Sequence, residues 1–217
     1  MKSMLEGGPM SERRISIPWI TVILIGINLI LYGLETITGG SESNRVAIRF
    51  GAQYLPLVLQ GEYWRVFTSM FLHFGWDHLA GNMFSLFIIG QIVEPYYGRI
   101  RFLLLYLISG IGGNLLSLFM DMGSTEPAIS AGASGAIFGI MAAFLIFALD
   151  SQMRRAFPLP RVLLGLILSL APGFYSSGIN LSAHLGGFAV GLLMAFLLKL
   201  TLPRDRILVE EYEEFEE

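Results

Sequence analysis

The sequence predicts an all-α membrane protein built of six transmembrane helices, from its composition and from the spacing of its apolar stretches. Hydrophobic residues make up 54% of the 217 positions and charged residues only 14%, whereas a soluble domain carries about a quarter charged residues. The mean hydropathy is +0.64. Such a chain cannot cover a surface that faces water, so we expect the lipid bilayer to surround part of it.

The apolar stretches define the helices in order. A bilayer core about 30 Å thick is crossed by roughly 20 apolar residues. Six stretches approach that length, at about residues 18–37, 68–90, 101–120, 130–149, 161–175 and 182–202. The first is too long, and lacks the small-residue cleavage site, for a removed signal peptide. The fifth is short and ends at Ala171-Pro172-Gly173, which predicts a tilted or broken helix near one surface.

The basic residues predict the orientation of the six helices. If the chain crosses at each stretch, one side holds only Arg45, Arg49 and Arg65. The other side holds eleven Lys and Arg residues: Lys2, Arg13, Arg14, Arg99, Arg101, Arg154, Arg155, Arg161, Lys199, Arg204 and Arg206. Because basic residues favour the cytoplasmic side, we expect an integral membrane protein with both termini cytoplasmic.

The remaining segments complete the organisation. Residues 1–16 form a predicted cytoplasmic N-terminal segment, residues 17–202 the six-helix domain, and residues 203–217 an acidic cytoplasmic tail. Residues 38–67 form a long outer loop that is too apolar for a floppy linker. We expect this first outer loop to lie in the membrane interface, partly helical and packed against the bundle.

Several classes of function are excluded or disfavoured. The chain has no cysteine, which excludes disulfides, thiolate catalysis and Cys-based metal sites. It has no basic stripe, so we expect no nucleic-acid partner. No motif calls for a cofactor. A zinc site made from the three histidines, His73, His78 and His184, is a competing idea, but no His-Glu-x-x-His motif accompanies them, so we expect no metal.

Polar residues at membrane depth are costly and are candidates for function. His73, His78 and Asn82 fall in the early turns of the second predicted span, Ser134 falls about one turn into the fourth, and His184 falls in the first turn of the sixth. All three spans enter from the outer side in the predicted topology. The polar residues of three helices are therefore expected at one level, just below the outer surface.

Ser134 and His184 are the predicted nucleophile and general base. Glycines flank the serine and leave its hydroxyl open. Gly135 with Gly139, and Gly187 with Gly191, form small-residue faces that let two membrane helices approach closely. Plain helix packing explains such faces equally well, and a lone histidine can be satisfied by a backbone carbonyl. A serine and a histidine at equal depth, however, could meet within hydrogen-bond distance, as activation of a nucleophile requires.

His78 and Asn82 are spaced i, i+4 and share a helix face. Both side chains can donate hydrogen bonds to a developing oxyanion. The backbone N–H of Ser134 is a third candidate donor, since the first N–H groups of a helix have no partner within it. For His73 we expect a structural role, in which the residue bonds the outer loop in place.

Taken together, the motifs resemble the rhomboid family of intramembrane serine proteases. They are residues 62–65 (EYWR), 73–82 (HFGWDHLAGN), 132–135 (GASG) and 183–191 (AHLGGFAVG), in the order and on the spans expected for that family. The resemblance implies a rhomboid-like bundle with an interfacial first outer loop. It also implies a Ser134–His184 dyad without an acidic third member, and an oxyanion hole made by the Ser134 N–H, His78 and Asn82.

The resemblance also implies supporting roles. Trp64 and Arg65 resemble the structural motif of the first outer loop, and Glu94, between Gly90 and Gly98, resembles a helix-junction motif in which we expect a local cap or pair. Phe138 stands where some members have a tyrosine; we expect its ring to stack against His184.

The expected activity is cleavage of single-span membrane proteins near helix-destabilising residues, with the site open to the outer face. The short fifth span and residues 173–178 are expected to form a lateral gate and lid. Six spans without an appended soluble domain favour a minimal prokaryotic form in the plasma (inner) membrane. The natural substrate and the oligomeric state stay open. The alternatives are a catalytically silent relative that binds membrane proteins and a transporter, which usually has internal repeats and a site at the midplane.

Overall fold

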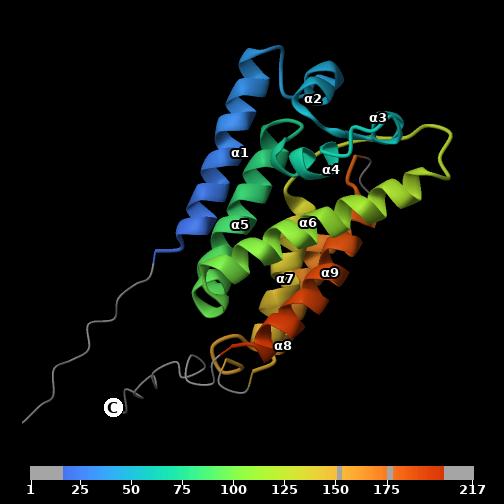
Figure 1. Cartoon of the computed structure of the whole chain (residues 1–217). Helices are drawn as coiled ribbons and strands as arrows, with labels where there is room; N and C mark the ends of the chain where they lie inside the picture. Colours follow the sequence, from blue (N-terminus) through green and yellow to red (C-terminus); the bar gives the residue numbers. More distant parts are fainter. Residues whose placement is uncertain (1–16, 151–152, 175–177, 203–217) are drawn as a thin grey trace, which may run out of the picture.

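The computed structural model describes residues 17–150, 153–174 and 178–202. Six longer helices make up most of this part of the chain (Figure 1): α1 (Trp19–Ile37), α5 (Trp76–Tyr97), α6 (Arg99–Asp121), α7 (Ser134–Ala148), α8 (Leu159–Leu170) and α9 (Leu181–Leu200). Three of them, α1, α6 and α9, are long and apolar enough to cross a membrane, and α7 and α8 are shorter apolar helices. The predicted N-terminal segment and acidic tail lie outside the described residues.

The helices form one bundle in which α7 contacts α5, α6 and α9, while α1 lies beside α5 (Figure 1). The shared core contains fully buried large side chains such as Leu86, Phe102, Leu105, Tyr106 and Ile140. Around it, the outer faces of α1, α6 and α9 carry many exposed Leu, Ile and Phe residues. An apolar exterior around an apolar core is what a bundle in lipid requires, because lipid replaces water at its surface.

Close backbone contacts hold α9 against α7 and α6. A Cβ atom on Gly187 would overlap the carbonyl of Gly135, and one on Gly191 would overlap the backbone of Gly139. On the other side of α9, a Cβ on Gly186 would lie 3.1 Å from the Cα of Gly113. The predicted close approach of the two glycine faces is confirmed, and it follows from the absence of side chains at these positions.

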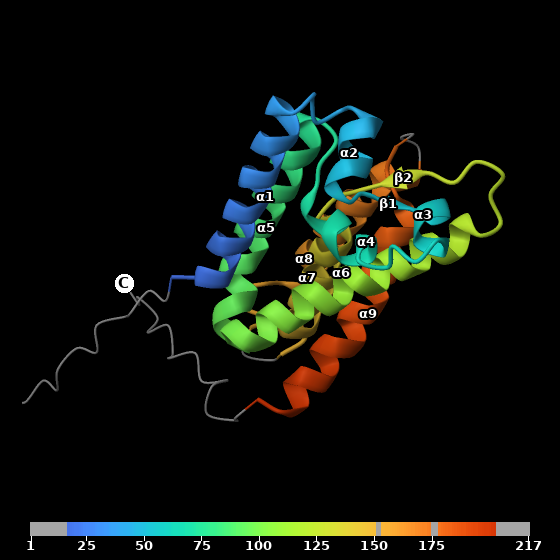
Figure 2. The same ribbon diagram turned by 45° about the horizontal axis from the view of Figure 1, so that its top comes forward.

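The loop of residues 38–67, the predicted first outer loop, is partly helical and packs on the bundle. It contains α2 (Asn44–Phe50), β1 (Gln53–Tyr54), α3 (Leu55–Leu59) and α4 (Arg65–Thr68), followed by the 3-10 helix η1 (Ser69–Phe71). Figure 2 shows these elements over one end of the helices. The expectation of a packed and partly helical loop is confirmed. The expectation of an all-α fold needs one correction, because β1 pairs antiparallel with β2 (Ile129–Ser130).

Hydrogen bonds of the Arg65 side chain hold this loop together. Its side chain is buried, and Nη1 donates to the carbonyls of Ile48 at 2.7 Å and Ala52 at 3.0 Å. Nε donates to the Glu62 carboxylate at 2.6 Å, and the guanidinium lies 4.6 Å from the ring centroid of Trp64. Five donors in a rigid fork let one arginine satisfy several acceptors. The structural role expected for Trp64 and Arg65 therefore has a physical basis, since Arg65 joins α4 to α2 and to Ala52, the residue before β1.

Glu94 makes its contacts with a distant helix, which corrects the expected local cap or pair. From α5, its Oε1 accepts the N–H of Ile20 at 3.0 Å, and its Oε2 accepts the N–H and the hydroxyl of Thr21, both at 2.8 Å. These donors lie in the first turn of α1, where backbone N–H groups lack helical partners. The buried carboxylate thus caps α1 and holds it beside α5.

Helix α5 starts later than the predicted second span. The chain from residue 69 onward first forms η1 and then an extended stretch, and α5 begins only after Gly75, whose φ is +78°. The apolar residues Met70 and Leu72 are buried in the protein. They raised the apparent length of the span because a hydropathy pattern does not separate side chains facing protein from those facing lipid. The fifth span is broken as expected: α8 gives way to the 3-10 helix η2 (Ala171–Phe174).

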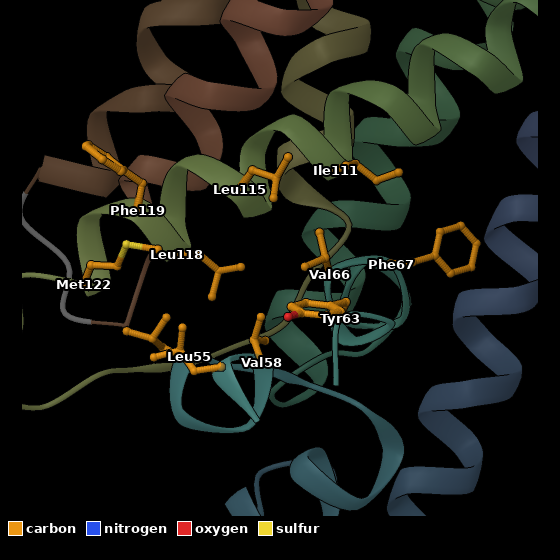
Figure 3. Close-up of a pocket in the computed structure, with 11 residues that line it drawn as sticks. Leu55, Val58, Tyr63, Val66, Phe67, Ile111, Leu115, Leu118, Phe119 and Met122 are labelled. Atoms are coloured by element: carbon orange, nitrogen blue, oxygen red, sulfur yellow. The ribbon is translucent and has the colours of Figure 1, made fainter. Parts of the chain in front are cut away.

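An apolar cavity of about 650 Å³ lies between the outer loop and α6 (Figure 3). Leu55, Val58 and Val66 line it from α3 and α4, and Leu115 and Phe119 line it from α6. Neither Ser134 nor His184 contributes to its wall. This cavity is therefore separate from the predicted site.

Candidate active site

Ser134 and His184 lie in contact. Ser134 is the first residue of α7, a turn earlier than the sequence pattern predicts, and His184 lies in the first turn of α9. The Nε2 atom of His184 lies 2.9 Å from the Oγ atom of Ser134. That distance allows the imidazole to accept the hydroxyl proton, which is the geometry of an activated nucleophile and its base.

The packing of α7 on α9 brings the pair together. The carbonyl of Ala183, next to the histidine, would lie 3.2 Å from a Cβ on Gly135, next to the serine. The two helices also begin at the same end of the molecule, near α2 and the β1–β2 ladder, as does α5 (Figure 2). The shared level of the three helix starts therefore follows from their common direction, as the sequence predicts.

The ring of His184 is held on one face by Phe138. The two ring centroids are 4.4 Å apart with an angle of 28° between the planes, so the rings stack. This is the stacking expected for Phe138. The second ring nitrogen, Nδ1, is buried and has no hydrogen-bond partner within the described ranges. The arrangement therefore pairs the histidine with a serine on one side and with an aromatic face, rather than a carboxylate, on the other.

His78 approaches the same space from α5. A Cβ on Gly132 would lie 2.8 Å from Cε1 of His78 and 3.6 Å from Oγ of Ser134. The imidazole of His78 and the hydroxyl of Ser134 therefore border the same small volume beside Gly132. Gly132 has φ of +147° and its N–H donates to the carbonyl of Ser69 at 2.9 Å. A residue with a side chain fits neither the backbone conformation nor the space.

Two further groups are candidate donors for the site. Asn82 lies one turn after His78 on α5, which packs against α7. It is buried, and its Nδ2 has no acceptor among the residues that the structure describes. The backbone hydrogen bond that starts α7 runs from the Ile137 N–H to the Ala133 carbonyl at 3.0 Å. The Ser134 N–H precedes it and is one of the N–H groups that a helix leaves unpaired.

His73 differs from the expectation in one respect. It lies between η1 and α5, and its backbone N–H, rather than its ring, donates to the Glu35 carboxylate of α1 at 3.3 Å. Its ring packs edge-on against His78, with centroids 5.1 Å apart. Burial, and to a smaller extent the neighbouring His78, lower the pKa of His73 to about 3. The ring is therefore neutral and serves as a packing surface for His78.

Sequence reasoning missed two asparagines close to the pair. Asn114, buried in α6, donates from Nδ2 to the carbonyl of Val66 at 2.8 Å and to the Ser69 hydroxyl at 2.9 Å. Asn180 precedes α9 and makes three side-chain hydrogen bonds. The usable signals were a polar residue inside an apolar stretch for Asn114, and an N-cap residue type before a helical stretch for Asn180.

The competing idea of a zinc site finds no cluster of ligands. Among the described residues, no three side chains of His, Cys, Asp or Glu gather in a way that could hold a metal ion. His73 and His78 are neighbours, but His184 is engaged with Ser134 and Phe138.

Known proteins with similar sequences indicate the family of this chain. Residues 60–200 match the Rhomboid domain family model. The chain is 32% identical over 212 residues to the rhomboid protease AarA of Providencia stuartii, covering 87% of this chain and 75% of AarA. It is 38% identical over 184 residues to the rhomboid protease GluP of Bacillus subtilis (strain 168), covering 84% of this chain.

A plant relative, RHOMBOID-like protein 5 of Arabidopsis thaliana, is 39% identical over 155 residues, or 70% of this chain. The matched region is only part of some relatives, since it covers 35% of GluP and 49% of the Arabidopsis protein. The family model and the match to AarA each extend over most of the chain described above. The chain is therefore a mostly helical integral membrane protein that belongs to the rhomboid family of intramembrane proteases.

Proposed function

We propose that this chain is an intramembrane serine endopeptidase that cleaves transmembrane segments of other membrane proteins. The observation that carries the proposal is the 2.9 Å distance between Ser134 Oγ and His184 Nε2. Family membership supports it, because GluP and AarA are both named rhomboid proteases. A catalytically silent relative would be expected to lack the serine or the histidine, and here both are present and in contact.

The proposed reaction passes through an acyl-enzyme. His184 Nε2 takes the proton of Ser134 Oγ, and the oxygen attacks the carbonyl carbon of the substrate peptide bond. The resulting oxyanion collapses as His184 gives its proton to the leaving nitrogen, which releases one fragment as an amine. Water then loses a proton to His184 and attacks the ester. As this second intermediate collapses, His184 returns the proton to Ser134 Oγ, which frees the serine and releases the other fragment as a carboxylic acid.

The oxyanion would be stabilised by the Ser134 N–H together with His78 and Asn82. Buried donors that already point toward the place where charge develops stabilise the transition state without reorganisation. The support for this role is the shared volume beside Gly132 and the unpaired Nδ2 of Asn82. Phe138 would restrict the His184 ring to the orientation that faces Ser134.

The proposed setting is a six-span domain of residues 17–202 with the site opening to the outer face of a prokaryotic plasma membrane and both termini cytoplasmic. The first outer loop would lie in the interface. Substrates would be single-span proteins whose helix unwinds near the cut, since a helical peptide bond is shielded by its own hydrogen bonds. Water would reach the site from the outer end, where α5, α7 and α9 begin.

Helix α8 is the proposed lateral gate. None of its twelve residues, all of them described, is buried. A cavity of about 150 Å³ separates it from its neighbours, lined by Ile89 of α5, Met141 of α7 and Val162 of α8 among others. A helix with few packed side chains can move at low cost. Of the expected lid, residues 173–178, the middle part lies outside the described residues.

The test is covalent labelling of the purified protein in lipid vesicles with a fluorophosphonate, a reagent that phosphonylates activated serines. We expect mass spectrometry to find the adduct on Ser134, and we expect His184→Ala to slow labelling by orders of magnitude because the base is lost. Folded wild-type protein that takes up no reagent would instead support the silent, substrate-binding relative.

A further inference from the structure

Asn180 connects the helix that carries His184 with the segment that leads to Ser134. Its Oδ1 accepts the N–H of Ala183 at 2.9 Å, which caps α9. Its Nδ2 donates to the hydroxyls of Ser117 at 2.6 Å and Ser130 at 2.8 Å. Its backbone carbonyl accepts the N–H of His184 at 3.2 Å. One side chain therefore forms hydrogen bonds with the start of α9 and with two other segments.

The two serines belong to the frame around the site. Ser117 is buried in α6, which packs along α9. Ser130 lies in β2, opposite Gln53 of β1, and precedes Ser134 by four residues. Together they fix the position of Asn180 relative to both α6 and the approach to α7.

We infer that Asn180 is a positioning residue, which holds the first turn of α9 so that His184 Nε2 stays within reach of Ser134 Oγ. This inference rests on the proposed function. A plain helix cap uses only the acceptor of the side chain. Here the donor is also used twice, and both acceptors lie on segments that border the site. A displacement of about 1 Å at a reacting group can cost about 10²-fold in rate.

Substitutions can separate the cap that Asn180 places on α9 from the connection, which is its pair of hydrogen bonds to Ser117 and Ser130. Asn180→Ser keeps a capping oxygen but is too short to reach Ser117 and Ser130. The double variant Ser117→Ala/Ser130→Ala keeps the intact cap and removes the connection. Asn180→Asp keeps both, since serine hydroxyls can donate to a carboxylate. Ser124→Ala, at an exposed position in the loop after α6, is the control for the serine substitutions.

The measurement is the rate and the final extent of Ser134 labelling by a fluorophosphonate, with kcat and KM for a reconstituted single-span reporter. We expect Asn180→Ser and the double variant each to lower the labelling rate and kcat by about tenfold or more. The extent of labelling and KM should stay unchanged, and Asn180→Asp should restore most of the rate. Asn180→Ser and the double variant remove the same hydrogen bonds. The triple variant that combines them should therefore be no slower than Asn180→Ser alone.

A merely structural role would lower the extent of labelling and the thermal midpoint rather than the rate per labelled site. Wild-type rates in both Asn180→Ser and the double variant, or a loss confined to the extent of labelling, would overturn the inference. Failure of the proposed function looks different, since then the wild type itself would take up no reagent at Ser134.

Discussion

At the scale of single residues, the position of Ser134 explains why it, among the serines of the chain, is suited to attack a carbonyl. As the first residue of α7 it combines a hydroxyl 2.9 Å from His184 Nε2 with an N–H at a helix N-terminus. The proposed nucleophile and one proposed oxyanion donor thus come from the same residue. The glycines on either side keep the surrounding volume open for a substrate backbone.

The role of Asn82 predicts a loss of rate without a loss of binding. Asn82→Ala removes a donor proposed to bond the oxyanion, and loss of one such donor costs about 10²–10³ in kcat. We expect a fall of that size in kcat for a reconstituted single-span reporter, with KM little changed, and a smaller loss than for Ser134→Ala. Asn44→Ala, at an exposed position in α2, is the matched control. Full activity of Asn82→Ala would remove this residue from the oxyanion hole.

Gly132→Ala tests the small volume that His78 and Ser134 border. In Gly132→Ala the new methyl group would lie 2.8 Å from His78 Cε1, and the backbone φ of +147° would be strained. We expect displacement of His78 and a loss of kcat of about tenfold or more. Gly123→Ala, where the nearest atom lies 3.9 Å away, should leave kcat unchanged. An unaffected Gly132→Ala enzyme would mean that His78 acts elsewhere.

The candidate site residues and the contact between Ser134 and His184 could be predicted from the sequence, whereas the hydrogen bonds that surround them could not. Ser134, His184, His78 and Asn82 stood out because polar groups in apolar stretches are costly. Helical spacing also relates His78 to Asn82. Asn180 did not stand out, since its partners Ser117 and Ser130 are 63 and 50 residues away. Only the folded chain shows which distant hydroxyls one amide can reach.

At the scale of elements, α8 is the helix whose motion the proposed function needs most. Ile89 and Val162 face one cavity from α5 and α8, and the chain has no native cysteine. We expect a thiol crosslink between Ile89→Cys and Val162→Cys to abolish cleavage of a membrane substrate. Labelling of Ser134 by a small fluorophosphonate should persist, because that reagent does not need the gate.

The controls for the crosslink are the two single-cysteine variants treated with the same reagent, which should cleave at the wild-type rate. A reducible crosslinker should allow activity to return on reduction. Undiminished cleavage by the fully crosslinked protein would show that substrates enter by another route.

The sequence predicted the existence of the helices better than their limits. The second span was placed too early because Met70 and Leu72 are apolar, although the chain is not helical at Leu72 and turns at Gly75. The β1–β2 pair was not predicted because each strand has only two residues, too few to show an alternating pattern. The capping of α1 by Glu94 could not be predicted either, because the sequence does not indicate which helix N-terminus a carboxylate will contact.

At the scale of the whole molecule, the alternation of helix directions predicts which loops face the same side. Glu126 lies in the loop between α6 and α7, and Arg154 in the segment between α7 and α8. In intact spheroplasts, we expect a membrane-impermeant maleimide to label Glu126→Cys and to spare Arg154→Cys until the membrane is permeabilised. The reverse pattern would invert the proposed orientation and place the site toward the cytoplasm.

The central claim is that the Ser134–His184 pair cuts within membrane spans, and cleavage of a reconstituted single-span reporter tests it most directly. Wild-type protein should cut the reporter within or near its span, with the site defined by mass spectrometry of both fragments. Ser134→Ala and His184→Ala should leave it intact, and chelators should not reduce the wild-type rate. Cleavage that survives Ser134→Ala, or a folded wild type that cuts none of a panel of spans, would contradict the account.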